Sequence, residues 1–159
     1  MKILHTADWH LGKKLDHYSR LAEQAEVFDE ICAIAEVQRP DLVLIAGDIY
    51  DAFNPPTEAQ RLLYETLVRL SKNGQIPVLA IAGNHDSPEK IESPDALAQL
   101  NGILFSGLPK TRIDFQSKVP GFEVLRSDFG FIELTINGVD YLCESFTRRI
   151  PMKTDCKST

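Results

Sequence analysis

Short apolar runs alternate with segments of helical periodicity over the first two thirds of the chain. The apolar runs are residues 2–7, a short segment that ends at Asp8, and residues 41–48 and 76–83. The last two are typical of strands buried on both faces of a parallel sheet. Residues 19–38 and 58–71 instead carry apolar side chains at helical spacing. The alternation predicts an α/β domain with crossover connections between parallel strands.

Local signals mark the ends of these elements. Ser19 is the expected N-cap of the first helix, Arg39-Pro40 its stop, and Asn73-Gly74 the end of the second helix. Ser93-Pro94 starts a shorter helix that contains Leu97 and Leu100, and a further strand follows at 103–105. The pattern to this point is strand, helix, strand, helix, strand, helix, strand.

The pattern changes character after this last strand. Two alternating segments flank Asn137-Gly138, a dipeptide that strongly favours a tight hairpin turn. The predicted organisation is a metal-binding α/β core over 1–106, a loop and β-hairpin region of the same domain over 107–147, and a flexible tail over 148–159.

Composition restricts the class of protein. Of 159 residues, 43% are hydrophobic and 25% are charged, as in ordinary globular domains, and no run approaches the roughly 18 apolar residues of a membrane span. Met1 leads directly into the first strand, so no signal peptide is expected. The three cysteines form no metal-type pair. We therefore expect a cytoplasmic protein with reduced thiols and no membrane partner.

Candidate chemistry follows three of the predicted strands. The segments are Asp8-Trp9-His10, Gly47-Asp48 and Gly83-Asn84-His85-Asp86. Ligand sites of open α/β sheets lie beyond the carboxyl ends of the strands, so the three segments should converge. Carboxylate, imidazole and amide groups together suit Mn, Mg, Fe or Zn. Each segment alone is a weak signal, since Asp after a strand is often only a helix cap.

The order of these motifs resembles that of the calcineurin-like metallophosphoesterases. Longer stretches, namely ILHTADWHLGKK, LVLIAGDIYDAFNPP and VLAIAGNHDSPE, are similar to the bacterial SbcD exonuclease family over roughly residues 1–105. The resemblance implies the calcineurin-like metallophosphoesterase fold. Only part of that fold is expected here: its first β-α-β-α-β half and a C-terminal β-hairpin region.

The resemblance also assigns roles at a site for two divalent ions, with Mn as the first expectation. Asp8 and His10 would bind the first ion, Asp48 would bridge both ions, and Asn84 would bind the second. His85 would stabilise the phosphoryl transition state or protonate the leaving oxygen. The plainer interpretation of His85 is a hydrogen-bonded turn residue.

Further residues near these motifs are candidates for supporting roles. Asp51 and Asp86 are expected behind the ligands, orienting a ligand or a turn, although a purely structural role fits Asp51 equally well. Trp9 should face away from the ligands and pack in the core. Four basic or titratable side chains after the first ligands are candidates for contact with DNA phosphates, or for a solvated turn: Lys13, Lys14, His17 and Arg20.

The family pattern also needs a later Gly-His and a Gly-His-x-His. The four histidines are His5, His10, His17 and His85, and none follows residue 85. We therefore expect an incomplete site with partial or no metal occupancy in this chain. The hairpin region should also expose apolar surface, which a homodimer would bury.

The resemblance implies a subunit that works with an SbcC-type ATPase on DNA ends. The full protein would be a 3'-5' exonuclease and endonuclease of repair and recombination, whereas the isolated chain is expected to be inactive. The net charge of -6 and pI near 5.2 argue against a generally basic DNA-binding surface, but not against local attraction at a cation site. Two alternatives remain: a metallophosphoesterase acting on a small phosphoester, and a non-catalytic binding or dimerisation module.

Overall fold

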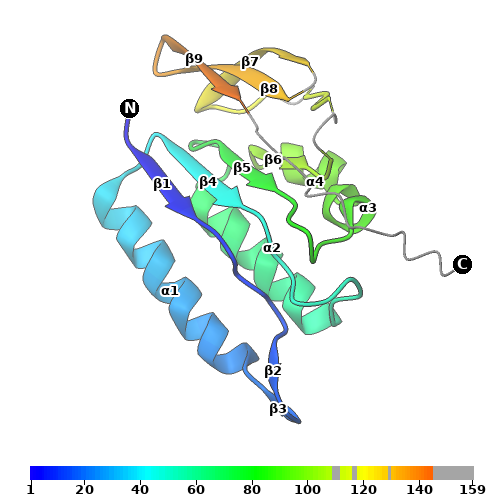
Figure 1. Ribbon diagram of the computed structural model, residues 1–159. Coiled ribbons are helices and arrows are strands. Elements are labelled where there is room, and N and C mark those ends of the chain that lie inside the picture. Colours follow the sequence, from blue (N-terminus) through cyan, green and yellow to red (C-terminus); the bar gives the residue numbers. More distant parts are fainter. Residues whose placement is uncertain (109–111, 116–117, 129, 145–159) are drawn as a thin grey trace, which may run out of the picture.

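Four parallel strands form the sheet that organises the chain (Figure 1). The computed structural model describes residues 1–108, 112–115, 118–128 and 130–144. The sheet has the order β1-β4-β5-β6. Its strands are β1 (Ile3–Thr6), β4 (Leu42–Ala46), β5 (Val78–Ile81) and β6 (Ile103–Ser106). The predicted α/β class and the parallel pairing are confirmed.

Two long helices cover one face of this sheet. They are α1 (Leu21–Gln38) and α2 (Thr57–Ser71). The predicted stop of α1 is confirmed: Arg39 is left-handed with φ 49°, and its N–H donates to the Ala35 carbonyl at 2.9 Å. The end of α2 is left-handed as well, at Lys72, Asn73 and Gly74.

The expected N-cap of α1 is wrong. Arg20 occupies the N-cap position and provides no side-chain cap. Ser19 belongs instead to β3 (Tyr18–Ser19), which pairs with β2 (Lys14–Leu15) in a two-stranded ribbon. The Ser19 hydroxyl still accepts a bond from the Leu21 N–H at 3.3 Å. The ribbon pairing therefore shifts the helix start by one residue.

Two short helices lie beside β6, and the sequence pattern describes them poorly. The predicted short helix is α4 (Asp95–Gln99), but its apolar pattern is not a core face, since Leu97 is 72% and Leu100 64% exposed. The preceding α3 (Pro88–Glu92) is unpredicted. Five residues are too few to show helical periodicity, and α3 buries Ile91 against the main core.

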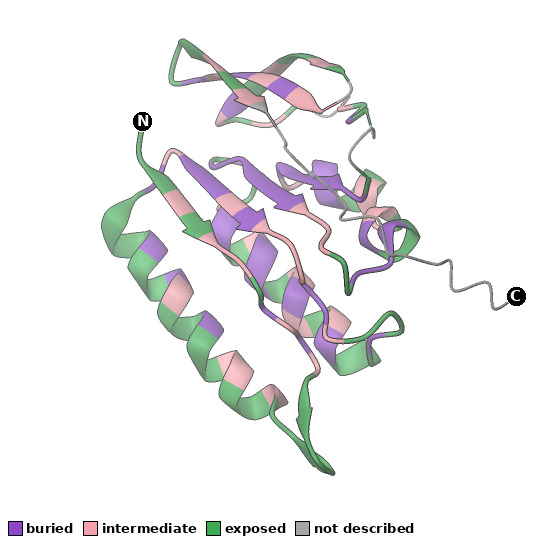
Figure 2. Ribbon diagram, in the orientation of Figure 1, coloured by how far each residue is buried: buried purple, intermediate pink, exposed green. Residues whose placement is uncertain are grey.

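The strands β4, β5 and β6 are buried on both faces, whereas the edge strand β1 alternates between exposed and half-buried residues (Figure 2). Successive side chains of a strand point to opposite faces. In β4, Val43 and Ile45 join the core under the helices, whereas Leu42 and Leu44 join a second core on the other side. β5 and β6 repeat this alternation. The sheet is thus the middle layer between the helices and a second sheet.

The second sheet is antiparallel, with the order β7-β8-β9. Its strands are β7 (Phe122–Asp128), β8 (Phe131–Ile136) and β9 (Val139–Glu144). The predicted hairpin turn is confirmed, because Asn137 and Gly138 connect β8 to β9 with φ of 53° and 76°. β7 is unpredicted, and a register shift between Val124 and Arg126 interrupts its alternation. The expected tail, 148–159, lies outside the described residues.

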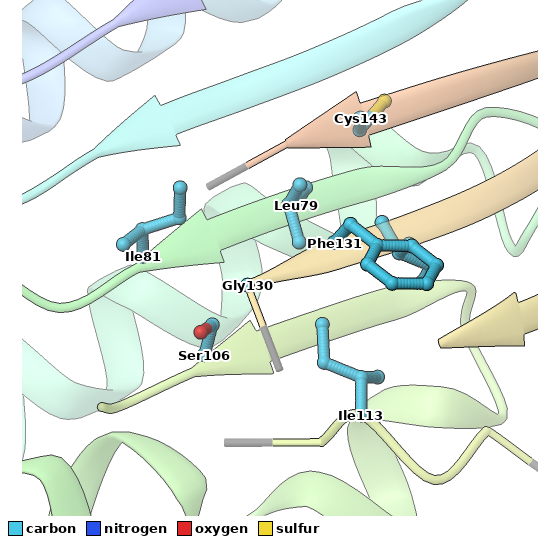
Figure 3. Close-up of a pocket in the computed structure, with 8 residues that line it drawn as sticks. Leu79, Ile81, Ser106, Ile113, Gly130, Phe131 and Cys143 are labelled. Carbon is cyan, nitrogen blue, oxygen red and sulfur yellow. The ribbon is translucent and has the colours of Figure 1, made fainter. Parts of the chain in front are cut away.

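A small gap lies between the two sheets (Figure 3). Its volume is about 20 Å³, which is room for roughly one water molecule. Apolar side chains such as Leu79, Ile81 and Phe131 dominate its lining. Burial raises the pKa of the Cys143 thiol on its wall, so this thiol is protonated at neutral pH. The gap is therefore a packing defect between layers and offers no room for a substrate.

Cys32 is the second cysteine that the structure describes. Cys32 is free and buried on α1, and burial raises the pKa of its thiol as well. Cys156 lies outside the described residues. Within the described parts of the chain, no helix has the length and apolar character needed to cross a membrane.

We expect the antiparallel sheet to depend on Leu134, which is 0% exposed between the two sheets. Leu134→Ala should lower the free energy of unfolding by about 2–5 kcal/mol, because it leaves a cavity in a packed core. Leu142→Ala is the matched control, since Leu142 is 55% exposed on the same sheet. Urea unfolding measures both variants, and equal losses would contradict this packing.

Candidate metal centre

Three loops meet at the carboxyl ends of β1, β4 and β5. Backbone bonds continue between the loops after the strands end: the Asp8 N–H donates to the Gly47 carbonyl at 3.1 Å, and the His10 N–H donates to the Asp48 carbonyl at 2.9 Å. On the other side, the Gly47 N–H donates to the Ile81 carbonyl at 2.9 Å. The sheet register therefore fixes how the loops lie beside one another.

Asp8, His10 and Asp48 form a cluster of potential ligands. One ligand atom of each residue lies within 4.8 Å of the others. Two oxygen or nitrogen ligands of one cation are separated by at most about 4 Å, since each bond is roughly 2.1 Å long. Small side-chain adjustments would therefore let all three bind one ion. The donor set fits a divalent cation, and its mixture of carboxylate and imidazole includes no thiolate.

The backbone of these three residues is left-handed. The φ angles are 56° at Asp8, 43° at His10 and 47° at Asp48, next to Gly47 at 85°. Asp and His are among the residues that tolerate this region best. The chain therefore turns sharply at each potential ligand, which brings side chains from separate strands together.

Gly83 allows the loops after β4 and β5 to approach closely. A Cβ atom at this position would lie 2.1 Å from Asp48 Oδ1 and 2.2 Å from the Asp48 nitrogen. Real Cβ atoms do not come so near to other heavy atoms, so only glycine fits beside Asp48 in this arrangement.

Asp86 connects the same two loops. It is 2% exposed. Oδ2 accepts bonds from the N–H groups of Gly83 at 2.7 Å and Ile49 at 3.0 Å, and Oδ1 accepts one from Tyr50 at 2.8 Å. A carboxylate that accepts several N–H bonds holds the donating backbone segments firmly in place, because charge-assisted hydrogen bonds are shorter and stronger than neutral ones. Asp86 therefore sets the distance between the two loops.

Asn84 and His85 lie on the turn that Asp86 holds, and both are exposed. The His85 N–H donates to Asp48 Oδ1 at 3.0 Å, which helps to orient that carboxylate. The imidazole of His85 meets that of His10 edge to face, with ring centroids 5.4 Å apart. His85 is thus beside the potential ligands and open to solvent.

Gln24 supports the loop after β1, and sequence reasoning missed it. From α1, its Nε2 donates to the carbonyls of Trp9 at 3.2 Å and His10 at 2.8 Å, and its Oε1 accepts the Gly12 N–H at 3.0 Å. A glutamine on a half-buried helix face is the one hint that the sequence offers.

Trp9 packs in the core as predicted. It is 7% exposed, and its ring centroid lies 4.5 Å from that of Phe28.

Some of the predicted DNA-contact residues lie beside the cluster. An open cleft of about 350 Å³ runs from Asp8 and His10 along α1, and Lys13 and Arg20 line it. Arg20 is paired with Glu23 of α1 at 2.7 Å. The two remaining candidates, Lys14 and His17, belong to the exposed ribbon of β2 and β3 and are not among the residues that line this cleft.

Asp51 also lies next to the cluster. Its Oδ1 is 3.4 Å from His10 Nδ1 and 3.7 Å from Lys13 Nζ. The contact between Asp51 and His10 does not have the geometry of a hydrogen bond, so the buried Nδ1 atom of His10 has no hydrogen-bond partner among the described residues. Asp51 thus faces the ring of one potential ligand without belonging to the three-residue cluster.

Comparison with known proteins agrees with this geometry. The model of the calcineurin-like phosphoesterase family matches residues 1–148. The chain is 49% identical over 111 residues to the SbcD subunit of nuclease SbcCD from Bacillus subtilis, covering 70% of this chain and 28% of that protein. It is 39% identical over 104 residues to the protein of the same name from Rhodobacter capsulatus, covering 65% of this chain and 26% of that protein. The chain spans about a quarter of the length of these relatives.

The bonds of Asp86 lead to a stability prediction. Asp86→Asn replaces an accepting oxygen with an amide that donates, so at least one buried N–H loses its partner. The free energy of unfolding should fall by about 1–3 kcal/mol. Asp16→Asn is the control, since Asp16 is exposed in a left-handed turn that Asn tolerates. Guanidinium unfolding compares the two, and an equally small change in both variants would contradict the role of Asp86.

Proposed function

The chain belongs to the calcineurin-like phosphoesterase family, and we propose that it forms the metal-binding N-terminal part of a DNA nuclease subunit of the SbcCD type. The observation that carries the proposal is the convergence of Asp8, His10 and Asp48 at one edge of the sheet, with the exposed imidazole of His85 beside them. The named function of the relatives supports a nuclease. Because the chain spans a fraction of those proteins, their full activity is part of the proposal.

In the complete protein, the proposed centre would hold two divalent cations, with manganese favoured over magnesium, iron or zinc, whereas this chain alone would be partly occupied or empty. Carboxylate, imidazole and amide donors without a thiolate suit these ions. Asp8 and His10 would bind the first ion, Asp48 would be shared, and Asn84 would bind the second. Such ion pairs activate water and neutralise charge on a phosphoryl group.

His85 is the proposed catalytic residue. Its backbone N–H is bonded to Asp48, so the ring is held next to the ligands while its side chain stays exposed. An imidazole in this place can hold a proton and deliver it to the leaving oxygen of a phosphodiester. The substrate phosphate would lie between this ring and the ligand cluster.

DNA is the proposed substrate, and an SbcC-type ATPase is the proposed partner, with cytoplasmic action at DNA ends. The cleft beside Asp8 would admit a phosphate backbone, and Lys13 lines it with an exposed ammonium group. Lys14 and His17 extend this surface on the neighbouring ribbon. Bound cations would supply further positive charge at this end of the cleft, where Asp8 and His10 also line it.

We expect this chain to bind Mn²⁺ weakly and exchangeably through its cluster. In a titration followed by the electron paramagnetic resonance signal of free Mn²⁺, the wild-type chain should remove ion from solution. Asp48→Ala should weaken binding about tenfold or more, because it removes the shared ligand. Asp16→Ala, at an exposed turn, should leave the affinity unchanged. Equal affinities in all three proteins would place the ion elsewhere.

A graft tests the nuclease assignment. Residues 1–106 of this chain replace the aligned segment of the Bacillus subtilis relative, with which the match is 49% identical. The chimera should cleave duplex DNA when Mn²⁺ is present, and His85→Ala in the same chimera should lower the rate about 100-fold or more while the fold is kept. Circular dichroism controls for folding.

The outcomes separate the alternatives. A folded chimera that cleaves bis(p-nitrophenyl) phosphate but not DNA would indicate a phosphoesterase for small substrates. A wild-type chain that binds DNA or a partner protein, yet no Mn²⁺ at millimolar concentration, would indicate a non-catalytic binding module. Either result contradicts the proposal.

A further inference from the structure

We propose that Asp51 is a positioning residue, which holds the His10 imidazole with a proton on Nδ1 and the lone pair of Nε2 free for a cation. The inference rests on the proposed metal centre. It begins with the contact of 3.4 Å between Asp51 Oδ1 and His10 Nδ1. Asp51 would not touch the ion, so its effect passes through His10.

The buried state of His10 Nδ1 determines which proton arrangement fits. This atom is shielded from solvent and has no fully formed hydrogen bond in the described part of the chain. A neutral imidazole donates from one nitrogen and accepts at the other. The polar atom facing Nδ1 is a carboxylate oxygen, which accepts when ionised, so the proton belongs on Nδ1. Nε2 then carries the lone pair that a cation requires.

The length of the contact is consistent with this role. At 3.4 Å it is longer than the usual 2.7–3.2 Å of an N–H···O bond. Hydrogen bonds at reactive sites are often long in the resting protein and shorten when the site is engaged. The Asp51 side chain is 33% exposed, so it has space to make this adjustment.

The backbone fixes Asp51 beside His10. The Leu11 N–H donates to the Ile49 carbonyl at 2.9 Å, and the Asp51 N–H donates to the Leu11 carbonyl at 3.1 Å. An isolated parallel bridge between Leu11 and Tyr50 lies between these bonds. Leu11, Ile49 and Tyr50 are at most 2% exposed. This short continuation of the β1–β4 pairing therefore places residue 51 next to residue 10 on a rigid support.

Lys13 completes the arrangement from the solvent side. Its Nζ lies 3.7 Å from the same Asp51 oxygen that faces His10. This ion pair helps to hold the Asp51 carboxylate beside the His10 ring. Lys13 is about half exposed, so this contribution is screened by solvent and salt.

Nuclear magnetic resonance of the whole chain tests the proton arrangement without any metal. Long-range proton–nitrogen spectra of ¹⁵N-histidine protein at about pH 8.5, well above the ordinary histidine range, distinguish the two neutral forms. His10→Gln identifies the His10 signals. We expect wild-type His10 to carry its proton on Nδ1, and Asp51→Ala to shift the population toward Nε2. Asp51→Asn keeps an accepting oxygen and should preserve the wild-type form.

A Mn²⁺ titration of the same variants gives the second readout. Asp51→Ala should weaken binding about 10–100-fold, with partial recovery in Asp51→Asn and no change in Asp16→Ala. The inference is overturned if Asp51→Ala keeps both the His10 proton on Nδ1 and the wild-type affinity. If the wild-type chain binds no Mn²⁺, the proposed weak site of the isolated chain fails, whereas the spectra still report whether Asp51 orients His10.

Discussion

The buried carboxylate of Asp86 holds together the loops after β4 and β5, and the geometry of the candidate metal centre depends on it. A buried carboxylate is costly unless hydrogen bonds satisfy its oxygens, and here the three N–H groups of Gly83, Ile49 and Tyr50 do so. These N–H groups lie in the segments that carry Asp48 and His85. Asp86 acts as structure rather than as a ligand.

The second constraint is the conformation of the backbone at the potential ligands themselves. Left-handed conformations carry a steric cost for most residues, yet Asp8, His10 and Asp48 all adopt them. The cost is tolerable because Asp and His visit this region more readily than bulky or β-branched residues. The same residue types also bind divalent ions. Chemistry and backbone conformation therefore select the same amino acids at these positions, with Gly83 supplying the space beside them.

Sequence patterns predict the features of this fold that arise from local or strand-level chemistry. The sequence predicts the buried strands β4 and β5 and the turn at Asn137-Gly138. A strand covered on both faces needs apolar residues, and a left-handed turn needs residues that tolerate positive φ. Features that depend on partners far away in the chain are not predicted by local patterns. Two of the three bonds of Asp86, and those of Gln24, join segments separated along the chain, so no local spacing encodes them. β7 is hidden for a related reason, since its bulge breaks the alternation that marks a strand.

The cleft beside the cluster has a consequence for the timing of ion exchange. Its walls are held by backbone bonds and by Gln24, while Asp8 is exposed at its mouth. Among the described residues, no segment would have to unfold for an ion to reach or leave the cluster. The residence time of a bound ion would then be set by ligand exchange with water and by ligand number. Occupancy would follow the free ion concentration of the surroundings, and an ion of the wrong kind could be replaced during the lifetime of the molecule.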